Sequence, residues 1–297
     1  MIAVHPGPYT FPAALAELPS GRRIKYYTCG KTGQGPTLIF IHGLGNYAQV
    51  WFKLMDQLQE QFHGIALDLP GHGDSPGIGP VENIGTFAKV LEELLDYLPI
   101  EDFVLVGHSM GGLTALRTVL RRKLSPRALV LLAPAGFEIF SPKDEAWLSS
   151  IYSPGILAKL GRRRMEEQFR GNFHHFPADA AAMLADITYL KNSEHYLAYC
   201  TNLAYCARAI FGENVYEELS AVDLPTLVYY GQEDAMVPHR VLHPDQSLDQ
   251  ICQSAVEKMP QAHLEFLAET GHMLQWESAE NVGAGISAFL IDLAVKK

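Results

Sequence analysis

The chain has 297 residues, of which 48% are hydrophobic and 19% charged, a balance typical of a globular protein with a sizeable core. Lys and Arg number 23 against 33 Asp and Glu, so the formal net charge is −10. Binding to nucleic acid by counterion release requires clustered Lys and Arg, and this acidic balance therefore argues against a general nucleic-acid partner.

Short β-branched and aliphatic runs alternate with amphipathic helical patterns along most of the chain. This alternation predicts a mostly parallel α/β sheet of about eight strands with helices on both faces. The predicted strands are Ile24–Tyr27 (as an antiparallel edge strand), Thr37–Ile41, Ile65–Leu69, Phe103–Val106, Ala128–Leu132, Thr226–Tyr230 and His263–Leu267. The predicted helices are Ala48–Glu60, Asn83–Leu98, Met110–Arg122 and Ser278–Val295. In open α/β sheets, ligands bind at the carboxyl ends of the strands.

One long stretch, residues 135–221, reads as helices only and holds 13 of the 30 aromatic residues. So long an insertion between two strands is too large for a loop, and it predicts a helical cap over the carboxyl edge of the sheet. The core domain then consists of residues 1–134 and 222–297. The aromatic side chains can form the cap's own core or face the cleft beneath it, and the second arrangement would make that cleft apolar.

The segment Gly107-His108-Ser109-Met110-Gly111-Gly112 directly follows one predicted strand and directly precedes a predicted helix. A serine hydroxyl is a weak nucleophile that needs exposure, a base and a site for the developing oxyanion. A sharp strand-to-helix turn exposes Ser109, and small neighbours relieve its crowding. The start of the helix offers backbone N–H groups, among them that of Met110. The pattern predicts that Ser109 is a catalytic nucleophile.

With this turn and four further segments, the chain resembles the α/β-hydrolase fold, specifically the cap-bearing members with a serine nucleophile. His42-Gly43-Leu44-Gly45 follows its strand as the family's oxyanion loop does, and the resemblance implies that Leu44 N–H is the second oxyanion donor beside Met110 N–H. The segment from Asp68 to Ser75 resembles a mainly structural family turn. Asp234 and His272 each follow a strand where the family places its acid and its base, in the family order Ser109, Asp234, His272.

The chemistry of such a site explains these residue types independently. His272 has to take the proton of Ser109 and hand it to the leaving group, which suits a side chain that titrates near neutrality. A buried carboxylate has to hold the imidazole in the right tautomer. Asp234 lies just before an apolar stretch and fits this task, with its neighbour Glu233 as the alternative. His42 and His72 are expected to shape loops.

The remaining patterns predict no cofactor, no metal ion and no stable membrane insertion. Gly30-Lys31-Thr32 lacks the earlier glycine of a phosphate loop, and no histidine pair has a full set of metal ligands nearby. No stretch approaches the ~20 apolar residues of a membrane span. The N-terminal segment does not read as a secretory signal, and four scattered cysteines favour reduced thiols. We therefore expect a cytoplasmic protein that acts on a small-molecule substrate; the sequence gives no oligomeric state.

The predicted function is hydrolysis of a carboxylic ester of a small, fairly apolar substrate through an acyl-enzyme intermediate. Within the fold, carbon–carbon bond hydrolysis is the first alternative, because the segment from Gly271 to Glu277 resembles the histidine segment of that subfamily. Epoxide hydrolases and haloalkane dehalogenases are disfavoured, since they carry an aspartate where Ser109 stands. A fold alone does not fix function, so three further alternatives stay open: a small-molecule receptor, an acyltransferase and a cofactor-free peroxidase.

Overall fold

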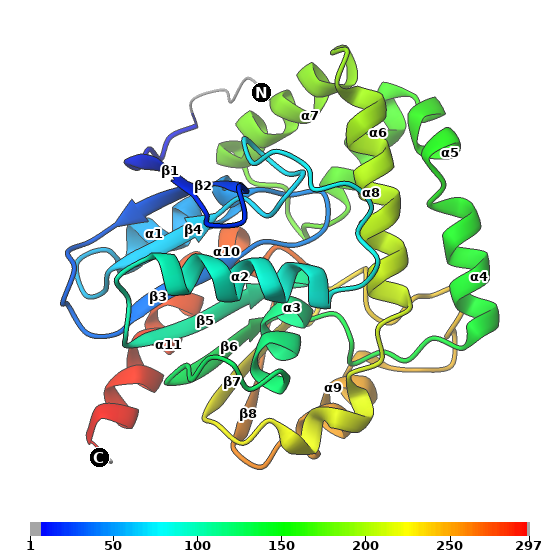
Figure 1. The fold of residues 1–297 in the computed structure, drawn as a ribbon. Coiled ribbons are helices and arrows are strands. Elements are labelled where there is room, and N and C mark those ends of the chain that lie inside the picture. The colour runs from blue at the N-terminus through cyan, green and yellow to red at the C-terminus, as the bar shows by residue number, and fades with distance from the viewer. Residues whose placement is uncertain (1–6, 296–297) are drawn as a thin grey trace.

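The computed structural model describes residues 7–295, which contain one eight-stranded sheet (Figure 1). The strands lie side by side in the order β1-β2-β4-β3-β5-β6-β7-β8. The pairs β1/β2 and β2/β4 are antiparallel and all the others parallel, so the predicted mostly parallel sheet is confirmed. Their bounds are β1 Ala13–Glu17, β2 Arg23–Cys29, β3 Thr37–Ile41, β4 Gly64–Leu67, β5 Phe103–His108, β6 Ala128–Leu132, β7 Thr226–Gly231 and β8 Ala262–Leu267.

Helices cover both faces of this sheet, which is why its central strands are apolar along their whole length. In β3, β5 and β6 every residue is buried. α2 packs against α3 on one face, and α1 packs against α11 on the other (Figure 1). The helices of this layer are η1 Ala48–Trp51, α1 Phe52–Leu58, α2 Gly85–Tyr97, α3 Met110–Leu120, α9 Leu248–Val256, α10 Leu274–Glu277 and α11 Ala279–Val295.

The predicted strands and helices agree with the structure to within two residues at each end, with one error at the edge of the sheet. β2 is antiparallel as expected, but it is not the edge strand, because β1 pairs with it from outside. The sequence of β1 is AALAE, which holds no β-branched or aromatic residue and therefore gives little strand signal. Helix α9 was not predicted either, although Ser247 and Gln250 form a capping box at its start.

Residues 135–221, between β6 and β7, fold into helices without a strand, as predicted. We call them the inserted helices. Their bounds are α4 Pro142–Ile151, α5 Pro154–Lys159, α6 Arg162–Arg170, η2 Ala178–Ala180, α7 Ala181–Lys191, α8 Tyr196–Phe211 and η3 Tyr216–Ala221. Helices α4 to α8 gather together beside one end of the sheet (Figure 1), whereas η3 contacts α9, where the hydroxyl of Tyr216 donates to Ser254 O. The division into a core domain and a cap domain stays a prediction.

Many aromatic side chains of the inserted helices pack on one another. The rings of Phe169, Phe173 and Phe176 contact each other edge to face. Phe169 and Phe173 belong to the main hydrophobic core, whereas Leu157, Tyr196 and their neighbours form a small separate core. The inserted helices are therefore held partly by their own packing and partly by the main hydrophobic core that they share with the sheet.

Candidate active site

Ser109 lies at the turn between β5 and α3 in a strained backbone conformation. Its φ is 52° and its ψ is −117°, a combination that side chains other than glycine rarely adopt. Such strain costs about 1–3 kcal/mol and persists only where the surroundings enforce it. The backbone N–H of Ser109 donates to Leu132 O of β6, and its carbonyl accepts from Ala135 and Leu113. These bonds fix the turn at the carboxyl edge of the sheet.

Two glycines allow this turn because no side chain fits where they lie. A Cβ atom at Gly107 would lie 2.5 Å from the carbonyl oxygen of Gly111, well inside van der Waals contact. A Cβ atom at Gly111 would lie 2.0 Å from the carbonyl oxygen of Ile41, the last residue of β3. The first turn of α3 therefore packs directly against the end of β3, where the segment from His42 to Gly45 begins.

The predicted oxyanion loop lies against Ser109. A Cβ atom at Gly43 would be 3.1 Å from Ser109 Cβ, and Leu44 is the next residue of that loop. Met110 is the first residue of α3, so its N–H has no acceptor within the helix. Both predicted oxyanion donors thus belong to segments that meet at Ser109.

The structure brings Asp234 and His272 together in a buried pair. Asp234 follows β7, His272 follows β8, and His272 Nδ1 lies 2.7 Å from Asp234 Oδ2. The other carboxylate oxygen, Oδ1, accepts the N–H groups of Met236 and Val237 at 2.7 and 3.3 Å. Asp234 is 6% exposed and His272 is 7% exposed. A buried carboxylate held in this way orients the imidazole and favours a proton on Nδ1.

The alternative acid, Glu233, does not reach this site. Its side chain is exposed to solvent, whereas that of Asp234 is buried, although the two are adjacent in the chain. Glu233 is held by its backbone, whose N–H donates to Thr270 O. The geometry therefore favours Asp234 over Glu233 as the partner of His272.

His108, which precedes Ser109 in the chain, contacts His272, and this contact was not predicted from the sequence. Its Nε2 lies 2.9 Å from the carbonyl oxygen of His272, and the two rings are 4.8 Å apart between centroids. Full burial lowers the pKa of His108 well below its ordinary value, so the ring is neutral. Because a carbonyl oxygen can only accept, the proton of the neutral ring sits on Nε2. The residue preceding Ser109 thus holds the turn that carries His272.

His42 and Asp68 stabilise the loops beneath the site, as expected for the segment that follows β4. His42 Nε2 accepts the N–H of Leu69 at 3.0 Å. The Asp68 carboxylate accepts the N–H groups of Ala48 and Asp74 at 2.8 and 2.9 Å. Burial raises the pKa of Asp68 to about 7. These contacts fix the oxyanion loop to the neighbouring turn from below.

The model for proteins with the alpha/beta hydrolase fold matches residues 36–279, which include Ser109, Asp234 and His272. The chain belongs to the alpha/beta hydrolase fold family. A relative from Pseudomonas putida, the dihydrolipoyllysine-residue acetyltransferase component of an acetoin cleaving system, is 30% identical over 91% of this chain and 67% of its own length. The chain thus spans about two thirds of that relative.

Two further relatives of this hydrolase-fold protein are enzymes of similar size. A pimeloyl-[acyl-carrier protein] methyl ester esterase of Aeromonas hydrophila is 29% identical over 69% of this chain and 80% of its own. A 2-hydroxy-6-oxononadienedioate/2-hydroxy-6-oxononatrienedioate hydrolase of Cupriavidus pinatubonensis is 25% identical over 88% of this chain and 89% of its own length. Homologues with ester-cleaving and other hydrolytic activities therefore coexist with acyltransferase components.

Among residues 7–295, no helix has both the length and the apolar character that a membrane span requires.

The hydrolase core is linked to the inserted helices by hydrogen bonds at the site. Tyr47, in the segment after the oxyanion loop, donates its hydroxyl to Asp186 of α7 at 2.5 Å, and both side chains are buried. Glu277 of α10 accepts backbone N–H groups from both sides of this boundary. The contacts of Tyr47 with Asp186 and of Glu277 with His175 were not predicted, because the partners lie more than a hundred positions apart along the chain.

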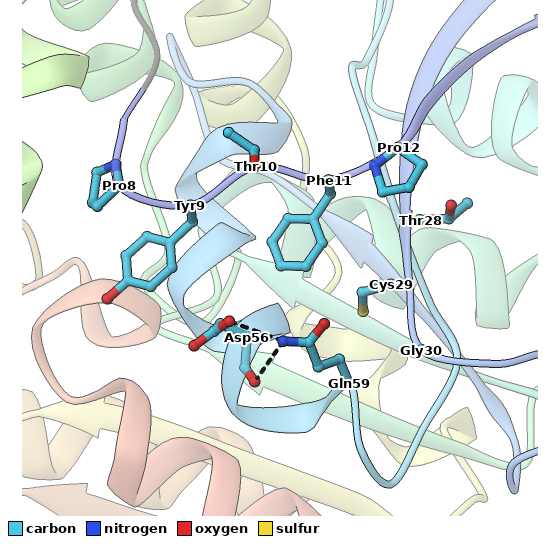
Figure 2. A pocket seen from close by; sticks show the side chains of 10 residues that line it. All are labelled: Pro8, Tyr9, Thr10, Phe11, Pro12, Thr28, Cys29, Gly30, Asp56 and Gln59. Atoms are coloured by element: carbon cyan, nitrogen blue, oxygen red, sulfur yellow. Dashed lines mark hydrogen bonds between the residues drawn. The ribbon is translucent and has the colours of Figure 1, made fainter.

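A separate groove lies under the N-terminal segment and holds no comparable chemistry among the residues described there (Figure 2). It has a volume of about 440 Å³ and lies between residues 8–12, the end of β2 and α1. Gln59 donates to Asp56 within it. Burial raises the pKa of the Cys29 thiol to about 12, so this cysteine is not a nucleophile at neutral pH. The described lining of the groove offers no activated nucleophile, and the site at Ser109 remains the candidate.

Proposed function

We propose that this protein is a serine hydrolase that cleaves a carboxylic ester of a small, fairly apolar substrate. The observation that carries the proposal is the buried Asp234–His272 pair beside the strained turn of Ser109. Three groups of the proposed reaction come from three different strand ends, which is the arrangement that a parallel sheet brings to one edge. Ser109 is the proposed nucleophile, His272 the base and Asp234 the acid that orients it.

In the proposed reaction, Ser109 Oγ attacks the ester carbonyl carbon while His272 Nε2 takes the hydroxyl proton. The tetrahedral intermediate collapses, its bond to the alcohol oxygen breaks, and His272 returns the proton to the departing alcohol. A water molecule, deprotonated by His272, then attacks the acyl-enzyme. The acid leaves, and Ser109 regains its proton. Water is the only reactant besides the ester.

The negative oxygen of each tetrahedral intermediate is proposed to lie between the N–H groups of Leu44 and Met110. Met110 N–H is free of an intrahelical acceptor, and the positive end of the α3 dipole lies at the same place. Loss of one such donor costs about 2.7–4 kcal/mol in the barrier. Because both donors are backbone groups, side-chain substitution tests them poorly.

We further propose that the inserted helices, residues 135–221, form a cap over this site and select the substrate. A crevice lies between the segment from Gly45 to Tyr47 and the helices α7 and α8. Ile187, Leu190 and Tyr199 contribute to its lining. The volume of this crevice, about 10 Å³, is too small for an acyl chain, so the proposed preference for medium acyl chains over acetates rests on the aromatic side chains of residues 135–221.

Labelling with a fluorophosphonate, read out by intact mass, tests the nucleophile directly. The wild type should gain one adduct, and Ser109→Ala should gain none while keeping its fold. Ester turnover should fall on the order of 10⁶-fold in the same variant. Substantial residual turnover would contradict the assignment of Ser109.

A substrate panel decides which bond is cleaved. It should hold p-nitrophenyl esters from acetate to octanoate, a carbon–carbon bond substrate of the vinylogous diketone class, and an added alcohol as a competing acyl acceptor. Preferential ester hydrolysis that peaks beyond acetate supports the proposal. Turnover confined to the diketone, or transfer of the acyl group to the alcohol in place of water, would replace ester hydrolysis by one of those reactions.

A further inference from the structure

The carboxylate of Glu277 accepts three backbone N–H groups. Gly271 N lies 2.8 Å from Oε2 and His174 N lies 3.1 Å from the same oxygen. His175 N lies 2.5 Å from Oε1. Glu277 has no side-chain cation among the partners that these bonds provide, so its charge is balanced by backbone dipoles of the two segments that it holds.

These N–H groups come from the two sides of one boundary. Gly271 immediately precedes His272, whereas His174 and His175 follow α6 in the inserted helices. The two segments also touch directly: Met273 N donates to Asn172 O at 3.1 Å, and a Cβ atom at Gly271 would lie 2.6 Å from His174 N. The turn that carries His272 and the segment from Asn172 to His175 therefore form one hydrogen-bonded unit.

We propose that Glu277 is a positioning residue that fixes His272 by tying its turn to the inserted helices. This inference rests on the proposed function, in which His272 is the base. Glu277 is not expected to touch the substrate, because its two oxygens are occupied by backbone N–H groups. Charge-assisted bonds of this kind are short and strong, and both carboxylate oxygens are acceptors. In a glutamine, an oxygen in the place of Oε2 would keep the N–H groups of Gly271 and His174, but the NH₂ group in the place of Oε1 would face the N–H of His175, so the three bonds cannot all be kept.

Two variants separate position from charge. Glu277→Gln keeps the length of the side chain and removes its charge and one acceptor. Glu277→Asp keeps the charge and withdraws the carboxylate from the three N–H groups by one carbon–carbon bond. Glu280→Gln is the matched control, because Glu280 is exposed at the start of α11, three residues further along. It undergoes the same change of charge without a bond to either segment.

The readouts are kcat and KM for a p-nitrophenyl ester, together with the rate constant and the amplitude of fluorophosphonate labelling. A displacement of about 1 Å in a catalytic group costs up to 10²-fold in rate, so both Glu277 variants should lose roughly 10- to 100-fold in kcat. Their KM should stay near the wild-type value. The labelling rate constant should fall by the same factor, because labelling also needs His272 as the base. Glu280→Gln should match the wild type.

The observed labelling rate constant scales with the folded fraction of a variant, so it is divided by the folded fraction that urea unfolding gives, and a destabilised variant still gives a result. Wild-type labelling rates in both Glu277 variants would overturn the proposal. A loss confined to Glu277→Gln would assign the effect to charge, and a raised KM with an unchanged kcat would assign it to substrate binding; either result overturns positioning. If the wild type and Glu280→Gln neither label nor turn over the ester, the proposed function itself fails.

Discussion

Replacing Asp234 by asparagine tests the orientation of His272, because the structure dictates how the amide would sit. Oδ1 of Asp234 accepts two backbone N–H groups, those of Met236 and Val237, and Oδ2 lies against His272 Nδ1. The carbonyl oxygen of the introduced amide would have to take the place of Oδ1, because an NH₂ group there would face two donors. Its NH₂ group would then point at His272 Nδ1, which could only accept.

This geometry would force the histidine proton onto Nε2, the atom that has to receive the proton of Ser109. A reversed tautomer of this kind lowers kcat by about 10⁴-fold, or roughly 5.4 kcal/mol in the barrier at 1.36 kcal/mol per tenfold change. The fold should change little, because the substitution is isosteric and the two backbone N–H groups keep an acceptor. We expect the free energy of unfolding to fall by no more than about 1–2 kcal/mol.

The assay is kcat for a p-nitrophenyl ester at pH 7, combined with urea unfolding. Glu233→Gln is the control, since Glu233 is the adjacent carboxylate and its side chain is exposed. It should retain wild-type activity. An Asp234→Asn variant that keeps more than about a tenth of the wild-type kcat would refute the tautomer argument. Equal losses in the two variants would instead point to the overall charge of this loop.

Two further predictions concern stability. Tyr47→Phe removes a buried donor from the Asp186 carboxylate, so the free energy of unfolding in urea should fall by about 1–3 kcal/mol. The control is Tyr97→Phe, at a ring that is 50% exposed, which should change this free energy little. Equal effects in the two variants would contradict the reasoning. Burial raises the pKa of Asp68 from near 3.8 to about 7, so the folded state holds this proton more tightly than the unfolded state. The stabilisation of the fold by this proton is therefore complete below pH 3.8 and is lost as the pH rises through 7. Unfolding free energies between pH 4 and 7 should therefore decline more steeply in the wild type than in Asp68→Asn, by at most about 1.4 kcal/mol per pH unit, and parallel curves would show that Asp68 does not titrate in this range.

The sheet and the three proposed catalytic side chains could be predicted because their signals are local. Each apolar run is short and bounded by turn residues; Ser109 follows such a run directly, and Asp234 and His272 lie in the turns after β7 (which ends at Gly231) and β8 (which ends at Leu267). The parallel arrangement then brings the ends of β5, β7 and β8 to one edge without further information. The edge strand β1 was not predicted, because its alanines can form the backbone hydrogen bonds of a sheet but have a low strand propensity.

The positioning contacts could not be predicted, because their partners are backbone groups. Glu277 accepts N–H groups of Gly271, His174 and His175, and His108 donates to the carbonyl of His272. Every residue except proline offers an N–H and every residue a carbonyl, so the identity of these partners leaves no trace in the sequence. Only the path of the chain decides which backbone group comes within reach of a given side chain.

Residues 135–221 contact three segments of the proposed site through hydrogen bonds: the one after the oxyanion loop, the turn of His272 and the loop after Asp234. Tyr47 ties the segment after the oxyanion loop to Asp186 of α7, and Glu277 ties the turn of His272 to the segment after α6. In the loop that follows Asp234, His243 and the N–H of His239 both contact Glu138, at the start of the insertion.

Because these three segments have such links, the helices that would select the substrate also set the geometry of groups that would act on it. Substitutions within residues 135–221 should therefore change kcat as well as KM. An insertion exchanged for that of a relative would carry its specificity over only if the acceptors at positions 138 and 186 and the backbone path at 172–175 came with it. The insertion and the loops that it holds are in this respect one structural unit.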